Sequence, residues 1–193
     1  MNKNKVIIVS GQDIIKRTKK ALEKLAPTLP SLGSKILIKP NLVEPLPENS
    51  GAVTRPEVIE GIIQFLGDKN YQILIGESSG SWDTKEAFIK AGYQELEKKY
   101  NIKLINFDEV EFVKIKTKKS IWPEIEIAKP CFEVSYLISA APLKEHPYYE
   151  VTLTCKNMMG VIKPDKRYKS ANKQYIHKED NKKIWAGRLC LLF

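Results

Sequence analysis

Short apolar segments alternate with helical patterns along most of the chain, and this alternation places the strongest constraint on the fold. The sequence predicts strands at Lys5–Ser10, Lys35–Lys39, Tyr71–Ile75, Asn101–Phe107 and Val134–Ala141, all rich in Ile, Leu or Val. Helical spacing of apolar residues fills much of the chain between them. Strands that alternate with helices usually form a parallel sheet covered on both faces. We therefore predict an α/β fold, a three-layer sandwich with a mostly parallel sheet.

Three helices are predicted from apolar spacing and from residues that commonly begin helices. The first covers Gln12–Leu25. The second begins at Thr54, which would share a capping box with Glu57, and Pro56 suits its first turn. The third begins within residues 83–84.

Two further segments, Val110–Lys118 and Ile121–Ala128, alternate apolar with charged residues. This period of two predicts an antiparallel hairpin inserted into the α/β fold, with its turn around Lys118–Ser120. A chain of 193 residues can bury one hydrophobic core but not clearly two. We predict a single α/β domain over residues 1–193.

The chain carries a net charge of +9, and its basic residues are mostly lysines. Of the 32 basic residues, four are arginines and 28 are lysines scattered over the whole length. Nucleic-acid surfaces favour arginine because its guanidinium group makes bidentate contacts with bases and phosphates. The composition therefore argues against nucleic-acid binding.

The sequence also predicts the compartment. No apolar run approaches the roughly 18 residues that a membrane helix needs, and Val6–Val9 is too short for a signal peptide. The three cysteines, Cys131, Cys155 and Cys190, lack the close pairs of a zinc or iron–sulfur site. We therefore predict a cytoplasmic protein with no membrane segment and no metal site, and the cofactor stays unassigned.

Polar loops follow three of the predicted strands. They are Lys39-Pro-Asn41, Gly76-Glu-Ser-Ser-Gly80 and Pro142-Leu-Lys-Glu-His146. Because the carboxyl ends of parallel strands lie at one edge of a sheet, these loops should meet around a single crevice where the strand order reverses. The polar stretch Thr152–Asn157 follows the last of them. The sequence therefore predicts a ligand site at this edge.

Lysines stand out among the polar residues of this predicted site. If two of Lys39, Lys144 and Lys156 place their ammonium groups about 6 Å apart, the repulsion at an effective dielectric near 20 is roughly 3 kcal/mol, or about two pKa units. A bound anion, Glu77 or Glu145, or loss of a proton from one lysine would relieve it. We therefore predict that the site binds a small carboxylate or phosphate anion.

The predicted site residues fall into two groups. The catalytic candidates are His146, as acid or base, with Lys144 and Lys156. The candidates for substrate binding lie at strand ends or in the loops beside them: Lys39, Asn41, Thr54, Ser78, Ser79, Thr152 and Asn157. The alternative is that each lysine is an ordinary surface residue at a strand end. Whether the protein is an enzyme stays open.

A second interpretation concerns Gly76-Glu-Ser-Ser-Gly80, which matches the G-x-S-x-G turn of serine hydrolases. Ser78 would be the nucleophile, and Asp108 and His146 follow in the hydrolase order. However, Trp82-Asp83-Thr84 delays the helix that should begin almost at the serine, and no glycine-rich oxyanion loop precedes it. A serine hydrolase is therefore the weaker alternative.

Several of these stretches resemble an uncharacterised bacterial and archaeal family known as domain of unknown function 362. The matching stretches are Lys39-Pro-Asn-Leu-Val43, Gly51-Ala-Val-Thr54 with Pro56, Gly76-Glu-Ser-Ser79, Ala141-Pro-Leu-Lys144 with His146, and Val151-Thr-Leu-Thr-Cys-Lys-Asn-Met-Met-Gly160. Together they cover about Ile36–Lys163, and Arg167 and His177 continue the pattern. The resemblance is specific for membership of the family and does not define an activity.

The resemblance also implies a second class of function. Members of the family often continue into an Asp-Gly and glycine-rich stretch, and some carry a ferredoxin-like module with clustered cysteines, neither of which this sequence contains. The resemblance therefore implies a version truncated at its C-terminus. It also implies an accessory or electron-transfer role beside an iron–sulfur protein, since three dispersed cysteines cannot hold a four-cysteine cluster within one chain.

Overall fold

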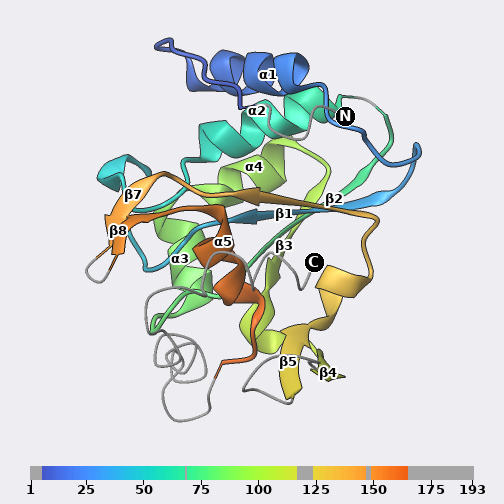
Figure 1. The fold of residues 1–193 in the computed structure, drawn as a ribbon, viewed down its shortest axis with the longest axis vertical. Helices are drawn as coiled ribbons and strands as arrows, with labels where there is room; N and C mark the ends of the chain where they lie inside the picture. The colour runs from blue at the N-terminus through green and yellow to red at the C-terminus, as the bar shows by residue number, and fades with distance from the viewer. Residues whose placement is uncertain (1–5, 68, 117–123, 147–148, 165–193) are drawn as a thin grey trace.

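The computed structural model describes residues 6–67, 69–116, 124–146 and 149–164. Its centre is a four-stranded parallel sheet in the order β3-β2-β1-β6 (Figure 1). The strands are β1 (Lys35–Pro40), β2 (Gln72–Glu77), β3 (Ile102–Asn106) and β6 (Tyr136–Ala140). The predicted α/β fold with a parallel sheet is confirmed. The strand order reverses beside β1, because β2 and β6 pair with opposite edges of that strand.

The central strand β1 is buried on both faces, as its continuous apolar run predicts. Ile36 and Ile38 pack into the core on the helical side of the sheet. Leu37, between them, packs into a second core on the opposite side. Alternate side chains of one strand therefore hold two layers against the sheet.

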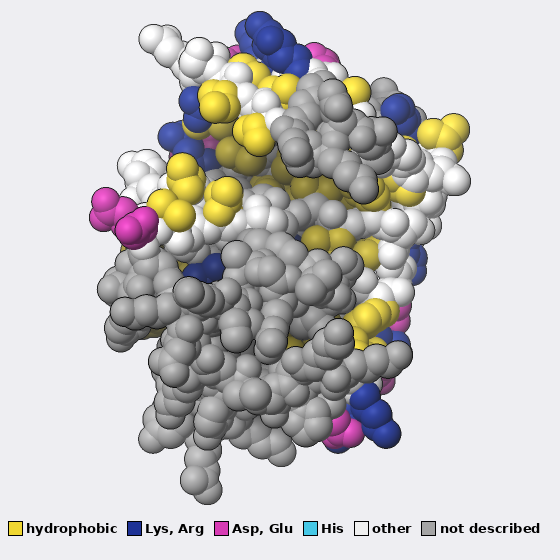
Figure 2. Space-filling view, in the orientation of Figure 1, with side chains coloured by type: hydrophobic (Ala, Val, Ile, Leu, Met, Phe, Trp, Pro, Cys, Tyr) yellow, Lys and Arg dark blue, Asp and Glu magenta, His cyan; other side chains and the backbone are white. Residues whose placement is uncertain are grey.

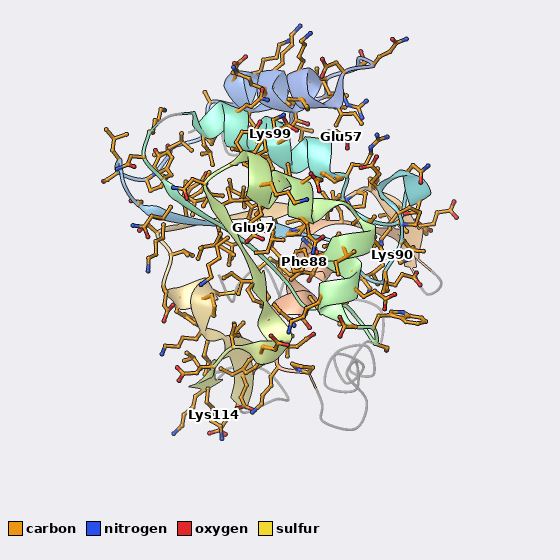
Figure 3. All side chains as sticks on the ribbon, turned by 180° about the vertical axis from the view of Figure 1, so that it is seen from behind. Glu57, Phe88, Lys90, Glu97, Lys99 and Lys114 are labelled. Atoms are coloured by element: carbon orange, nitrogen blue, oxygen red, sulfur yellow. The ribbon has the colours of Figure 1, made fainter. Side chains whose placement is uncertain are left out.

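Three helices cover one face of the sheet: α2 (Pro56–Leu66), α3 (Thr84–Lys90) and α4 (Tyr93–Lys99). The Asp83 side chain caps α3 by accepting a 2.8 Å hydrogen bond from Glu86 N, which confirms the predicted start of that helix. Gly92, with φ of 77°, separates α3 from α4. Figure 3 views the molecule from this helical side and labels Phe88, which is buried in the core.

Helix α1 (Ile14–Leu25) forms an outer layer on α2 and confirms the first predicted helix. The two helices approach closely at Gly61, where an added Cβ atom would lie 2.7 Å from Thr18 Cβ and 2.8 Å from the Ile15 carbonyl oxygen. Figure 2 shows basic side chains gathered over the outer face of α1. The lysines of this amphipathic helix therefore face away from its partner.

The opposite face is covered by an antiparallel hairpin, β4 (Phe112–Lys116) and β5 (Glu124–Ala128), together with a 3₁₀ turn over Met158–Val161 (Figure 1). The predicted hairpin is confirmed, although its predicted turn lies outside the described residues. A short hairpin, β7 (Lys144–His146) and β8 (Tyr149–Thr152), leads into helix α5 (Thr154–Asn157). The sequence did not predict this second hairpin, because strands of three and four residues leave almost no periodic pattern.

Two local predictions are wrong. Residues 6–10 of the predicted strand Lys5–Ser10 form no strand, and Val6 and Ile8 are 82% and 90% exposed. A short apolar run favours an extended backbone, but a strand forms only where a neighbouring strand is available for hydrogen bonding. Local composition does not determine that. The capping box at Thr54 is also absent, since α2 begins after Arg55 and has no side-chain cap. The Thr54 hydroxyl instead joins two loops at the carboxyl edge of the sheet.

Of the described helices, none is long and apolar enough to cross a membrane.

Candidate functional site

A buried ion pair lies where β1 and β2 end. Lys39 Nζ contacts Glu77 Oε1 at 2.5 Å, and the two side chains are 1% and 3% exposed. The ammonium group also donates to the Pro40 carbonyl oxygen and to Asn157 Oδ1, each at 3.1 Å. Three acceptors match the three N–H donors of a lysine. Lys39 is therefore saturated by protein groups.

Glu77 is equally well satisfied on its side of the pair. Its Oε2 accepts a 2.9 Å hydrogen bond from Leu42 N, and its Oε1 accepts one of 2.9 Å from Ser78 N. A charge this deeply buried is stable only when it is paired and hydrogen-bonded. The backbone after β1 and the backbone after β2 are thus both fixed by one carboxylate.

Asn157 connects α5 to the ends of the strands. Its Oδ1 accepts from Lys39 Nζ and, at 3.4 Å, from Asn41 Nδ2. Its Nδ2 donates to the Lys39 carbonyl oxygen and to Ser139 Oγ, both at 3.0 Å. The amide therefore pins the short helix to β1 and β6 with all of its hydrogen-bonding groups in use.

Gly160 lies directly against the ion pair. A Cβ atom at this position would be 2.4 Å from Glu77 Oε1 and 2.6 Å from Lys39 Nζ. These distances are far below normal contact, so only glycine allows the backbone after α5 to close over the charges. This role of Gly160 was not predicted from the sequence, because the apolar residues on either side of the glycine do not indicate what its backbone approaches.

Lys144, from β7, links the loop after β1 to the segment before α2. Its Nζ donates to Asn41 Oδ1 at 2.8 Å and to the Ala52 carbonyl oxygen at 2.6 Å. Asn41 is itself held by its backbone N–H, which donates to Thr54 Oγ1 at 2.9 Å, while Thr54 donates to the Ala140 carbonyl oxygen. The loops after β1 and β6 and the start of α2 therefore meet here, as the parallel sheet requires.

Lys156, on α5, has different surroundings from Lys144. Both side chains are half-buried, yet in the part of the chain that the structure describes no acceptor is paired with Lys156 Nζ. Burial lowers the pKa of Lys156, and the positive charge of Lys144 lowers it further. Burial also lowers the pKa of Lys144, although the carboxylates of Glu44 and Glu77 oppose that change. Two cations thus share one edge of the sheet.

The remaining candidates divide between described and undescribed side chains. Thr152 is buried, and none of the described groups is bonded to its hydroxyl. His146 ends β7, but its side chain is outside the described part of the structure, as is His177. The predicted role of His146 as acid or base therefore stays a prediction.

Ser78 and Ser79 face other protein groups at the end of β2. Ser79 Oγ donates to the Leu42 carbonyl oxygen, and Ser78 Oγ donates to Asp108 Oδ1, each at 2.6 Å. The other oxygen of Asp108 accepts from Thr84 Oγ1 at 2.6 Å. In a serine hydrolase the serine donates to a histidine that the acid orients. Here Ser78 contacts Asp108 directly, and the side chain of His146 lies outside the described part of the structure, so the hydrolase interpretation stays a prediction.

A cleft of about 240 Å³ lies away from these residues, at the amino ends of β2 and β3, with Tyr71 and Asn101 among its lining. It contains none of the predicted site residues. Among the described side chains, no group of three or more His, Cys, Asp or Glu residues is placed to hold a metal ion. The lysines and asparagines at the opposite edge are therefore the chemically distinctive feature.

The thiol of Cys131, in the 3₁₀ turn Lys129–Phe132 before β6, provides a test of the packing on the hairpin side of the sheet. Burial raises the pKa of Cys131 to about 12, although the positive charge of Lys39 acts in the opposite direction. At pH 8 we expect iodoacetamide to modify Cys131 about a thousandfold more slowly in the native protein than in urea, because only the thiolate reacts. Peptide mapping by mass spectrometry separates this thiol from the other two. Equal native and denatured rates would contradict the buried environment.

The fold and these contacts define an α/β protein with a four-stranded parallel sheet and a cluster of lysines and asparagines at the carboxyl ends of β1 and β6. The chain belongs to the family described as Domain of unknown function (DUF362), which matches residues 36–189. This confirms the resemblance found in the sequence.

One curated relative is distant. The chain is 22% identical over 130 residues to the "Thylakoid-associated protein sll1697" of Synechocystis sp. (strain ATCC 27184 / PCC 6803 / Kazusa). The match covers 67% of this chain and 40% of that protein, so the chain spans less than half of the relative's length. No solved structure matches the chain.

Proposed function

We propose that the carboxyl edge of the sheet binds a small carboxylate or phosphate anion, with Lys144 and Lys156 as its cationic ligands. The observation that carries the proposal is the unequal pairing of three lysines at this edge. Lys39 has a carboxylate partner, whereas Lys144 has only neutral oxygen acceptors and no described acceptor is paired with Lys156. The edge therefore has two positive charges that Glu77 does not pair.

The proposal gives Lys39 and Asn157 a positioning role in place of direct contact with the ligand. Both side chains are buried and use their hydrogen-bonding groups on protein atoms. Asn157 holds α5, and thereby the backbone of Lys156, against the strands. Asn41 orients Lys144 through its Oδ1 atom. A rigid frame of this kind lowers the entropy that the lysines lose when they bind an anion.

The proposal also accounts for two half-buried lysines at one edge of the sheet, where the charge of Lys144 lowers the pKa of Lys156. A bound anion would offset the repulsion between the two ammonium groups, and this makes binding of the anion more favourable. Lys144 keeps one N–H donor beyond its two acceptors, and the Thr152 hydroxyl is opposite Lys144 in the β7–β8 register. These groups are the direct donors that we assign to the ligand.

Titration calorimetry at low ionic strength tests this assignment with two probes, inorganic phosphate and succinate. Replacing Lys144 or Lys156 by methionine should weaken binding by about 10- to 100-fold, the usual worth of a charged hydrogen bond. Binding should also weaken as the pH rises toward the lysine pKa values, because deprotonation removes the positive charge. Since both pKa values are lowered, the loss begins at a lower pH than for an ordinary lysine.

Lys85→Met is the matched control, because Lys85 is exposed and pairs with Glu109 on the helical side. It removes one positive charge from the chain but none from the site. Native affinity in both Lys144→Met and Lys156→Met would show that neither lysine is a ligand, whereas an equal loss in Lys85→Met would show that binding depends on net charge alone.

An accessory role beside an iron–sulfur protein stays a prediction, because no described contact bears on it. A cytoplasmic location likewise stays part of the proposal. It is supported by the dispersed cysteines of the sequence, while the printed name of the relative associates that protein with thylakoids. Cell fractionation with an antibody against this chain would distinguish the two locations.

A further inference from the structure

Helix α1 carries an excess of positive charge on the side that faces away from the protein. Its inner side is fixed by the close approach of Thr18 and the Ile15 carbonyl oxygen to Gly61 of α2. The opposite side carries the polar residues of the helix, as its apolar spacing requires. Only one of these, Glu23, is acidic. The basic residues of α1 are Lys16, Arg17, Lys19, Lys20 and Lys24.

The segment before α1 adds two exposed aliphatic side chains. Val6 and Ile8 are 82% and 90% exposed, whereas the residues that follow each of them are half-buried. The segment is anchored to the helix at Gly11, whose carbonyl oxygen accepts a 3.1 Å hydrogen bond from Arg17 Nη1. In Figures 1 and 3 it lies at the same end of the molecule as α1. Two such aliphatic groups on one segment form an exposed apolar spot.

Basic and aliphatic side chains thus occur together on the outermost layer of the molecule, over α1 and the segment before it (Figure 2). This combination suits an anionic lipid surface, which attracts ammonium groups and accepts aliphatic side chains among its headgroups. Attraction to such a surface does not require the bidentate geometry of arginine, so lysines are sufficient. A nucleic acid would use the same charges but leave Val6 and Ile8 in water.

We propose that α1 and residues 6–10 form a docking surface for the anionic face of a lipid membrane. The lysines of α1 contact the lipid phosphates and carboxylates, and Val6 and Ile8 enter the headgroup layer. The contact is peripheral and reversible, and it does not depend on a membrane-spanning helix. It is independent of the proposed anion site, because α1 packs on α2 whereas Lys144 belongs to the β7–β8 hairpin.

Co-sedimentation of the whole chain with lipid vesicles tests the proposal. One set of vesicles is phosphatidylcholine alone, and in the other about a quarter of the lipid is phosphatidylserine. We expect the protein to bind the anionic vesicles at least about tenfold more tightly at low ionic strength. The difference should shrink as salt is added, because salt screens charges at the surface.

A charge variant tests the contribution of the helix. Lys20 and Lys24 are both exposed, and replacing both by glutamine should weaken binding to anionic vesicles by about 30-fold, since each basic residue near such a surface contributes about fivefold in affinity. The matched control replaces Lys85 and Lys90 of α3, which are also exposed, by glutamine. It removes the same net charge and should weaken binding much less.

An apolar variant tests the contribution of the preceding segment. Ile8→Ser should weaken binding to anionic vesicles by about tenfold, because the side chain loses the apolar transfer from water into the interface. Its urea unfolding midpoint should not change, since Ile8 is exposed in the protein alone. Ile89→Ser on α3 is the matched control, because Ile89 is also an exposed isoleucine, and it should bind vesicles like the native protein.

The other possible occupants of this surface give different results. Equal binding to both kinds of vesicle, or native affinity in both the lysine double variant and Ile8→Ser, would overturn the proposal. Tighter binding to duplex DNA that Ile8→Ser does not weaken would assign the basic face to a nucleic acid instead. A dimer in size-exclusion chromatography that Ile8→Ser dissociates would show that a second copy of the chain covers the surface.

Lys144→Met separates this proposal from the anion site. It should bind anionic vesicles like the native protein while losing affinity for inorganic phosphate. If phosphate fails to bind the native protein but the vesicle results are as expected, the anion site fails and the docking surface stands. If Lys144→Met loses vesicle binding as strongly as the lysine double variant of α1, the lipid contacts the carboxyl edge of the sheet and the docking surface is wrong.

Discussion

Replacing Lys39 by methionine is expected to lower the free energy of unfolding by about 3–5 kcal/mol, the usual effect of breaking a buried ion pair. The substitution leaves Glu77 charged at a position that is 2% exposed. The hydrogen bonds from Leu42 N and Ser78 N remain, but they do not neutralise the carboxylate. Equilibrium unfolding in urea, followed by circular dichroism, measures the change.

A second variant separates the charge from the packing. In the double variant Lys39→Met with Glu77→Gln, no unpaired charge is buried, so part of the lost stability should return. Lys85→Met serves as the surface control, since its ion pair with Glu109 is 64% and 57% exposed, and its unfolding midpoint should not change measurably. A Lys39→Met protein as stable as Lys85→Met would contradict the assigned ion pair.

The strands were predictable because buried strands consist of apolar residues, which can be recognised in the sequence. β1 and β2 are short runs of Ile and Leu bounded by charged residues or by Pro and Gly, and each forms within about two residues of its predicted range. The same rule failed at Val6–Val9, whose apolar composition is similar. Pairing with a neighbouring strand, which a single segment cannot encode, decides whether such a run joins a sheet.

The position of the candidate site was likewise predictable. The hydrogen-bond and ion-pair partners of its individual lysines were not. Parallel topology alone brings the ends of β1, β2 and β6 together, so Lys39, Glu77 and Lys144 were expected to be neighbours. Which lysine pairs with which acceptor depends on side-chain direction and depth. From the sequence, all three lysines were candidates for contact with the ligand, whereas the structure pairs Lys39 with Glu77 and leaves Lys156 without a described acceptor.

Thr54 shows how tertiary contacts can override a local motif. Its spacing from Glu57 fits a capping box, and a helix does begin nearby at Pro56. The hydroxyl is used instead between Asn41 N and the Ala140 carbonyl oxygen, two groups that no local pattern connects. Tyr93 then donates to the Thr54 carbonyl oxygen at 2.9 Å, so the helical layer also supports this junction.

Substituting Gly160 by alanine is the second change with a large expected effect. The new Cβ atom would lie 2.4 Å from Glu77 Oε1, 2.6 Å from Lys39 Nζ and 2.8 Å from Lys39 Cε. Lys39 cannot retreat without losing an acceptor, and Glu77 cannot retreat without releasing a backbone N–H. We expect a loss of about 3 kcal/mol or more, at the upper end of the range for overpacked sites.

Gly80→Ala is the matched control for this prediction, because it adds the same methyl group at the same edge of the sheet. There the new Cβ atom would lie 3.3 Å from the Val43 carbonyl oxygen, a distance that a small shift relieves. Urea unfolding of the two variants should therefore show a much larger loss for Gly160→Ala, and equal losses would contradict the close approach. Because Asn157 bonds to Lys39 and to Asn41, a displaced ion pair should also weaken phosphate binding in any Gly160→Ala protein that folds.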